Sequence, residues 1–344
     1  MSLSAHKPPS FNICRHASMN PLRFSSGSLI ADRRADYAEM LLAAGDIRAA
    51  ADLMADAVAL VPDWVGGHYR LGEMRAEAGD VAGAHDAWRE CLRLDAADRL
   101  GASLKLELHG AVSGLDTAPS AFVETLFDQY AETFDEALVE KLEYRVPELL
   151  EKAVQAAAAG RTGFAHVVDL GCGTGLMGER LRRMASFIEG FDLSAEMLRK
   201  AEGKGLYDRL RQADLQTLQS LPRQADLVTA ADVFMYLGAL DRIFAMVAAH
   251  LSPGALFAFS VEKHDGPGDL QLRPSRRYAH APAYIARVAA AAGFDLVSQE
   301  DAVIRMDRGE PVVGLIVVAR KGVATDGVAE RAPGTAADQR PPAH

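Results

Sequence analysis

A run of glycines between an apolar segment and a helical pattern constrains the fold of this 344-residue chain more than any other feature. Residues 166–170 are mostly apolar and β-type, and Gly171, Gly173 and Gly175 follow at once. A helical pattern then begins at Leu176. Glycines allow positive φ and let the backbone approach a ligand without an intervening Cβ. The segment therefore predicts a strand that turns through a glycine loop into a helix, whose first N–H groups face a ligand.

The spacing of the glycines fits two kinds of ligand. Gly173-x-Gly175-x-x-Gly178 satisfies the dinucleotide fingerprint, and Asp192 follows at about the expected distance. Asp169 separates the two interpretations, because a carboxylate at the strand end repels a pyrophosphate but suits a ligand that carries an ammonium and a sulfonium. An NAD-dependent enzyme is the alternative, and it predicts nicotinamide binding.

Residues 168–175 resemble motif I of the class I S-adenosylmethionine (SAM) methyltransferases. The resemblance implies SAM as the cofactor and a seven-stranded, doubly wound Rossmann-like α/β sheet whose last strand is antiparallel. Strand-like and helical segments alternate from Phe164 onward, which is typical of that fold class. The further strands are expected at about 187–191, near Leu210, and at 225–231, 255–261, 293–304 and 311–320, with a turn at 251–254.

The resemblance also implies which side chains hold SAM. Asp169 would hold its amino-acid end, Asp192 both ribose hydroxyls and Asp214 the adenine amino group. Leu193 and Met197 would border the adenine. The full set of predicted cofactor residues is Tyr130, Asp169, Gly171, Cys172, Gly173, Gly175, Asp192, Leu193, Met197, Asp214, Leu215 and Asp232.

Tyr130 belongs to an aromatic helical face within residues 120–154, and core packing is the simpler explanation of that face. Residues 127–135, however, resemble the segment that covers the cofactor before motif I in small-molecule methyltransferases. An aromatic ring suits that place, because its quadrupole attracts a sulfonium. Tyr130 is therefore predicted to lie near the methionine part of SAM.

The segment after the fifth strand supplies the candidate catalytic residues. In this fold it commonly lines the acceptor site, and an imidazole there is suited to deprotonating a nucleophile near neutral pH. His280 is the predicted general base, with Tyr278 beside it, and His264 is a weaker candidate. A lone histidine is more often a surface or helix N-terminal residue, which is the alternative for each.

An internal repeat precedes the SAM-binding segment. Gly45-Asp46 returns as Gly79-Asp80, an offset that matches the tetratricopeptide period of about 34 residues. Residues 31–97 therefore resemble two tetratricopeptide repeats, a helical domain that binds a protein partner or only packs on the catalytic domain. The predicted division is a tail at 1–30, the all-α repeats at 31–115, a helical lid or linker at 116–160, the SAM domain at 161–322 and a tail at 323–344.

Composition narrows the setting and the substrates. A net charge of -10 argues against a broad nucleic-acid or anionic-membrane surface. The three cysteines are widely spaced, which predicts neither a metal site nor a disulfide framework and favours a reducing, cytoplasmic setting. No apolar run has the length of a membrane span, of about 18 residues or more. The fourth strand lacks the Asn/Asp-Pro-Pro-Tyr sequence of enzymes that act on base or amide nitrogens.

Two functions follow from these features. The first is methyl transfer from SAM to a hydroxyl, carboxylate or similar nucleophile of a small molecule or of a group on a carrier protein. The second is a scaffold protein, in which the repeats bind a partner and the SAM domain binds its ligand without catalysis.

Overall fold

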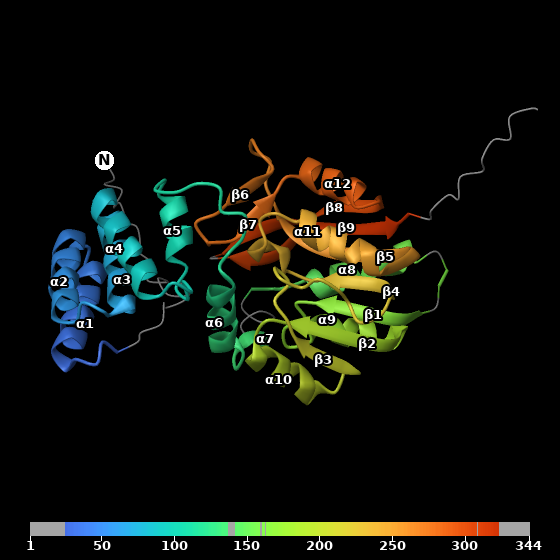
Figure 1. The fold of residues 1–344 in the computed structure, drawn as a ribbon, viewed down its shortest axis with the longest axis horizontal. Helices are drawn as coiled ribbons and strands as arrows, with labels where there is room; N and C mark the ends of the chain where they lie inside the picture. Colours follow the sequence, from blue (N-terminus) through green and yellow to red (C-terminus); the bar gives the residue numbers. More distant parts are fainter. Residues whose placement is uncertain (1–24, 137–141, 159, 162, 308, 323–344) are drawn as a thin grey trace, which may run out of the picture.

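The computed structural model describes residues 25–136, 142–158, 160–161, 163–307 and 309–322 (Figure 1). The expected tail at 323–344 and most of the tail at 1–30 lie outside the described residues. An all-α part precedes an α/β domain, as Figure 1 shows in blue to cyan and in green to red. None of the described helices combines the length and the apolar character that crossing a bilayer requires.

Two helix pairs form most of the all-α part, and their second helices start in the same way. The helices are α1 (Leu29–Ala43), α2 (Ile47–Leu60), α3 (Val65–Glu77), α4 (Val81–Leu94) and the shorter α5 (Ala102–Leu108). Gly45 and Gly79 turn the chain with φ of +88° and +82°. Asp46 and Asp80 then cap α2 and α4 through their side chains. This equivalence is what a repeat requires, while its assignment to the tetratricopeptide class stays a prediction.

Close packing holds the second helix pair together. The Trp88 indole of α4 is fully buried and donates a hydrogen bond of 3.2 Å to the Tyr69 carbonyl of α3. A Cβ at Gly72 would lie 2.4 Å from the Trp88 ring, so only glycine lets α3 approach α4 this closely.

The α/β domain contains a nine-stranded sheet in the described residues, rather than the expected seven strands. Its strands are β1 (Phe164–Leu170), β2 (Ala185–Asp192), β3 (Arg209–Gln212), β4 (Ala225–Ala230), β5 (Leu251–Lys263), β6 (Leu270–Leu272), β7 (Tyr278–His280), β8 (Phe294–Asp307) and β9 (Glu310–Lys321). The order is β3-β2-β1-β4-β5, with these five strands parallel, and β9 follows beside β5 with β8 beyond it. β9 is antiparallel to both neighbours, which confirms the expected antiparallel last strand.

The two additional strands are β6 and β7, which the sequence did not indicate. Glu262 of β5 pairs with Gly314 of β9 and also with Ala279 of β7. β7 therefore extends the sheet on the β4 side of β5, beyond the end of β4. Each of these strands has three residues, too few to show a two-residue alternation in the sequence.

The turn expected at 251–254 is instead part of β5. The pairing with β4 jumps from Ala225–Leu251 to Leu227–Leu256, so the Ser-Pro-Gly stretch forms an irregularity inside the strand. Gly254 there has a φ of +78°. Turn residues in a strand commonly mark such a bulge, which is why the sequence pattern suggested a turn.

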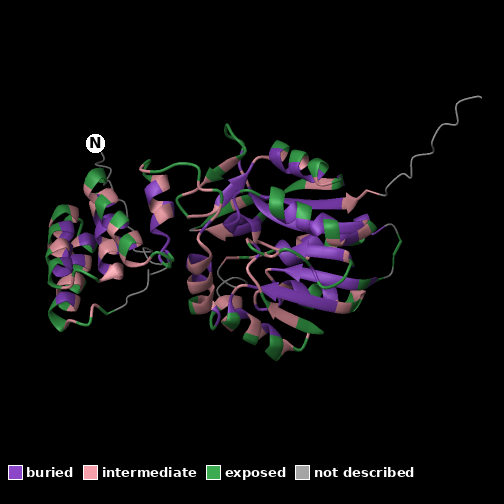
Figure 2. Cartoon of the chain, in the orientation of Figure 1, coloured by how far each residue is buried: buried purple, intermediate pink, exposed green. Residues whose placement is uncertain are grey.

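Helices cover both faces of the sheet, and the strands between them are the most buried part of the molecule (Figure 2). One face packs on α6 (Ser120–Tyr130), α11 (Asp241–His250) and α12 (Pro282–Ala291). The other face packs on α8 (Val146–Ala157) and α9 (Leu176–Leu181). The remaining elements are α7 (Phe134–Glu136), α10 (Ala195–Lys204) and the short helices at Arg182–Met184 and Phe234–Tyr236. This double covering explains why the parallel strands read as nearly continuous apolar runs.

Candidate functional site

A pocket lies at the carboxyl ends of β1, β2 and β4, where open α/β sheets bind ligands. Its empty volume is about 1040 Å³, including space open to solvent. The lining residues are Val123, Phe127, Phe134, Tyr144, Pro147, Gly171, Cys172, Gly173, Thr174, Leu176, Met177, Asp192, Leu193, Asp214, Leu215, Gln216, Ala231, Asp232, Val233, Tyr236, Leu237 and Arg277.

The glycine loop forms one wall of this pocket. Gly171 and Gly173 have φ of +66° and +53°, the left-handed region that favours glycine. A Cβ at Gly171 would lie 2.4 Å from the Val233 side chain, so the turn also needs glycine for space. Gly175, with a φ of +95°, is the N-cap residue just before α9, and it faces Tyr207 rather than the pocket.

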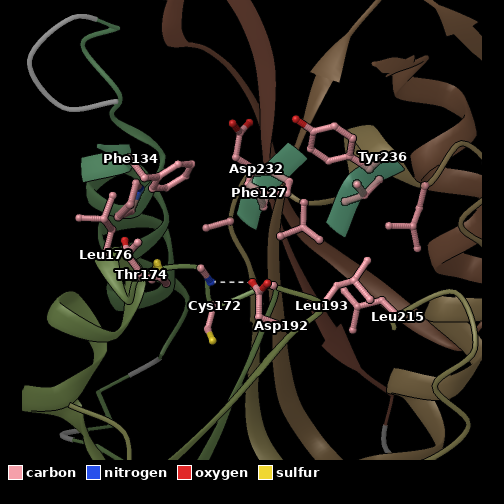
Figure 3. Close-up of a pocket in the computed structure, with 18 of the residues that line it drawn as sticks. Phe127, Phe134, Cys172, Thr174, Leu176, Asp192, Leu193, Leu215, Asp232 and Tyr236 are labelled. Atoms are coloured by element: carbon pink, nitrogen blue, oxygen red, sulfur yellow. Dashed lines mark hydrogen bonds between the residues drawn. The ribbon is translucent and has the colours of Figure 1, made fainter. Parts of the chain in front are cut away.

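Asp192, at the tip of β2, joins the glycine loop to the next helix (Figure 3). Its carboxylate accepts hydrogen bonds from the Gly173 N–H at 2.7 Å and from the Ser194 N–H at 2.9 Å. A carboxylate has about four lone-pair sites, so these two bonds do not use all of them. Burial raises the pKa of Asp192 to about 6. The group is therefore mainly ionised at neutral pH and lines the pocket as an acceptor.

Asp169, the predicted partner of the cofactor's amino-acid end, has other contacts. It is fully buried in β1 and does not line the pocket. Its two oxygens accept hydrogen bonds from the Tyr207 hydroxyl at 2.7 Å and from the Thr229 hydroxyl at 2.8 Å. Burial raises its pKa to about 6. We therefore revise its role from direct contact to positioning of the loop, since Tyr207 in turn packs against Gly175 and Gly178.

The segment from α6 to α7 covers the pocket. Its side chains form hydrogen bonds with the loops that follow β1, β2 and β3. Three of its side chains make these contacts: Ser120 donates to Asp214 at 2.8 Å, Asp128 accepts from the Ser194 hydroxyl at 2.5 Å, and Asp135 accepts from the Thr174 hydroxyl. Leu193, Asp214 and Leu215 line the pocket beneath this cover.

The aromatic residues that line the pocket differ from the one predicted. Tyr130 packs half-buried against the core of the sheet and is not among the lining residues. Phe127 and Phe134 of the same segment do line the pocket, with ring centroids 6.0 Å apart, and Phe127 lies 5.4 Å from Tyr236. The helical spacing indicated the face but not which aromatic residue is aimed inward. Met197 is likewise fully buried in α10, away from the lining.

The predicted catalytic pair is also directed elsewhere. His280 is fully buried in β7, and its Nε2 bonds to the carbonyls of Gly238 at 3.0 Å and Leu237 at 3.3 Å. Burial lowers the pKa of His280 to about 4, so the ring is neutral. The Tyr278 hydroxyl donates to the Leu115 carbonyl at 3.0 Å. Neither residue lines the pocket, so the geometry gives them structural contacts in place of the predicted roles.

His264, the weaker candidate, is buried as well and accepts the Gly266 N–H through Nδ1 at 3.2 Å. It too lies outside the lining residues. Three or more metal-ligating side chains gather nowhere in the described part of the chain.

A charged cluster that sequence reasoning missed lies at another side of the pocket. Asp232, at a φ of +60°, accepts from Nη1 of Arg305 at 3.0 and 3.1 Å. Arg305 also bonds Glu262. Burial raises the pKa of Asp232, against the influence of Arg305. Asp232 was predicted, but Arg305 follows it by 73 residues, and no local pattern indicates the pair.

Arg277 completes this side of the pocket. Its Nε donates to the Tyr236 hydroxyl at 3.2 Å. Burial disfavours the charge on Arg277, but the Tyr236 hydroxyl and the carboxylates of Glu262 and Asp232 outweigh burial and raise its pKa. Arg277 and Tyr236 both line the pocket, and neither was predicted from the sequence.

Residues 167–254 match the family model described as a methyltransferase domain. Trans-aconitate 2-methyltransferase of Deinococcus radiodurans is 37% identical over 106 residues, which cover 30% of this chain and 40% of that protein. Malonyl-[acyl-carrier protein] O-methyltransferase of Enterobacter lignolyticus is 29% identical over 128 residues, which cover 37% of this chain and 51% of that protein. The chain thus spans about half the length of the curated relatives it matches, or less.

Among solved structures, a SAM-dependent methyltransferase from Clostridium acetobutylicum is similar at 20% identity, with a TM-score of 0.45. The similarity covers 57% of this chain and 99% of that one.

Proposed function

We propose that this protein transfers a methyl group from SAM to an oxygen nucleophile of a small or carrier-bound acceptor. The observation that carries the proposal is the pocket itself, which is lined by the glycine loop, Asp192 and the aromatic side chains of Phe127, Phe134 and Tyr236.

The proposed binding mode assigns each part of SAM to a wall of the pocket. The ribose hydroxyls donate to Asp192, which has free lone pairs. The adenine lies between Leu193 and Leu215, with its amino group toward Asp214. The methionine part follows the backbone from Gly171 to Thr174, and the rings of Phe127 and Phe134 lie near the sulfonium, whose charge they attract.

Transfer in this site would rest on positioning. The sulfonium of SAM already carries an activated methyl group, so the protein has to hold the nucleophile in line with the bond from sulfur to methyl and exclude water. The names of two relatives support the proposed kind of acceptor, since one acts on trans-aconitate and the other on a malonyl group attached to a carrier protein.

A scaffold role is the second candidate, and one feature of the helical part favours it. The outer face of α1 exposes four large apolar side chains, a feature typical of protein-binding surfaces. These are Leu29, Ile30, Tyr37 and Met40, each more than half exposed.

Calorimetric titration of the full chain with SAM, S-adenosylhomocysteine and NAD in parallel tests the cofactor part of the proposal. We expect micromolar binding of both sulfur ligands and none of NAD. Binding of NAD alone would overturn the proposal in favour of a nicotinamide enzyme. Binding of the sulfur ligands without turnover on any small or carrier-bound acceptor would favour the scaffold role.

A further inference from the structure

The charged cluster beside the pocket has an excess of positive charge. Arg305 bonds both Asp232 and Glu262, and Arg305 and Glu262 are only 3% and 2% exposed. Arg273 approaches the second Glu262 oxygen at 3.8 Å. Together with Arg277, the cluster contains three guanidinium groups and two carboxylates. The Arg273 side chain is 32% exposed, so water solvates its charge.

Arg277 is the arginine of this cluster that is placed to hold an anionic ligand. Of the three arginines, Arg277 alone lines the pocket. Its Nε is bonded to Tyr236, while within the described part of the chain its two terminal nitrogens have no hydrogen-bond or ion-pair partner. A guanidinium presents its N–H groups as a planar fork that matches a carboxylate in geometry and charge. In Figure 3, Tyr236 and Asp232 lie across the cavity from Asp192, and Arg277 lines the same pocket.

The same pocket has no evident base for a neutral nucleophile. Its described lining residues include neither histidine nor lysine. Asp232 is tied to Arg305, while Asp192 and Asp214 accept backbone N–H groups. A hydroxyl acceptor would have to lose a proton to one of these groups. A carboxylic acid is already ionised at neutral pH, since its ordinary pKa is about 4, and requires no base.

We propose that the acceptor is a carboxylic acid with an apolar body, whose carboxylate is held by Arg277 and converted to a methyl ester. This inference rests on the proposed function. One carboxylate oxygen forms the bond to the methyl carbon as the bond from sulfur to methyl breaks, and its electron pair stays on sulfur. The anion and the sulfonium become a neutral ester and a neutral thioether, so no proton moves. Phe127, Phe134 and Leu237 supply the apolar lining for the acyl chain.

The test uses straight-chain carboxylates from acetate to dodecanoate, with the matching primary alcohols and alkyl phosphates. Each is titrated into the full chain saturated with S-adenosylhomocysteine. We expect carboxylates alone to bind, and Arg277→Met to weaken that binding about ten- to a hundredfold, the usual effect of losing a charged hydrogen-bond partner. Affinity for S-adenosylhomocysteine should stay unchanged. With SAM, the bound carboxylates should yield methyl esters that alkali cleaves to methanol.

Arg287→Met is the matched control, because Arg287 is an exposed arginine on α12 that pairs with Asp269. It should bind carboxylates like the unchanged protein. The inference is overturned if no carboxylate of the series binds, if alcohols or alkyl phosphates bind instead, or if Arg277→Met leaves carboxylate binding intact. Failure of S-adenosylhomocysteine to bind the unchanged protein would be a different result, because it contradicts the proposed function itself.

Discussion

At the residue scale, the cofactor end of the pocket depends on one carboxylate. Asp192 accepts two backbone N–H groups and lines the pocket with its remaining lone pairs. Asp192→Ala removes both the loop contact and the proposed acceptor of the ribose. SAM binding should weaken by about 1.5–3 kcal/mol, the range for hydrogen bonds to a charged group. Calorimetric titration measures this, and Asp295→Ala, an exposed aspartate at the start of β8, is the control. Unchanged SAM affinity in Asp192→Ala would rule out the ribose assignment.

The raised pKa of Asp192 predicts a pH dependence of cofactor binding. Because burial raises this pKa to about 6, the carboxylate becomes protonated as the pH falls through 6 and loses acceptor capacity. SAM affinity should therefore fall below pH 6. The stability of the free protein should depend on pH in the opposite direction. A group whose pKa is raised on folding adds to the stability below its ordinary pKa of 3.8, and this contribution is lost as the pH rises through 6.

Titrations with SAM over a pH series measure this effect, and Asp192→Asn should flatten the profile. A profile that keeps its slope in Asp192→Asn would assign the dependence to another group. Asp169 would be the first alternative, because its pKa is also raised to about 6.

At the element scale, glycine at position 72 sets how closely α3 and α4 pack. Gly72→Val would drive its Cβ into the fully buried Trp88 ring, with a separation of 2.4 Å before any adjustment. Overpacking of this kind typically costs about 1–3 kcal/mol. The unfolding transition of the helical part should therefore shift to lower temperature or lower urea concentration.

Gly203→Ala is the matched control with the opposite expected sign. Gly203 lies on the exposed side of α10 and a Cβ there meets nothing within 4 Å. Alanine in a helix is favoured over glycine by up to about 1 kcal/mol, so this variant should be as stable as the unchanged chain or slightly more so. If Gly72→Val were as stable as the unchanged chain, the result would contradict the close packing of α3 on α4.

At the scale of the whole molecule, one arginine connects the helical part to the turn that carries Arg277. Arg276 has a φ of +63° and lies between β6 and β7. Its Nη1 donates to the Tyr69 hydroxyl and to the Leu100 carbonyl, each at 3.0 Å. Its guanidinium also lies 4.5 Å from the centre of the Phe122 ring. The helical part and the pocket wall that contains Arg277 therefore share this turn.

Arg276→Met should loosen that connection, because it removes both hydrogen bonds and the contact between cation and ring. We expect faster hydrogen exchange in α5 and in the stretch that joins it to α6, with SAM affinity nearly unchanged. Ser275→Ala, an exposed change in the same turn, is the control. Equal exchange rates in Arg276→Met and the unchanged chain would show that the two parts are held together by other contacts.

The local patterns of the sequence determined the elements around the cofactor. The strand that turns through Gly171, Gly173 and Gly175 into α9 is confirmed, as is the helix that Ser194 caps. These features need only neighbouring residues, since glycine conformation, capping and apolar alternation act within a few positions. β6 and β7 were missed because their pairing depends on the distant edge of β5.

Which side chains face the pocket depends on contacts between segments that are distant in the sequence. Sequence position placed Asp169, His280 and Tyr130 near the ligand, but burial and long-range hydrogen bonds give them other partners. Arg277 lies at the pocket because it directly precedes β7, which pairs with the end of β5. The hydrogen bond to the Tyr236 hydroxyl then orients its guanidinium. The strand, the glycine loop and the acidic strand tip could be predicted because local chemistry sets all three. The pocket wall with Asp232 and Arg277 is assembled from segments far apart in the chain, and only folding brings their charges together.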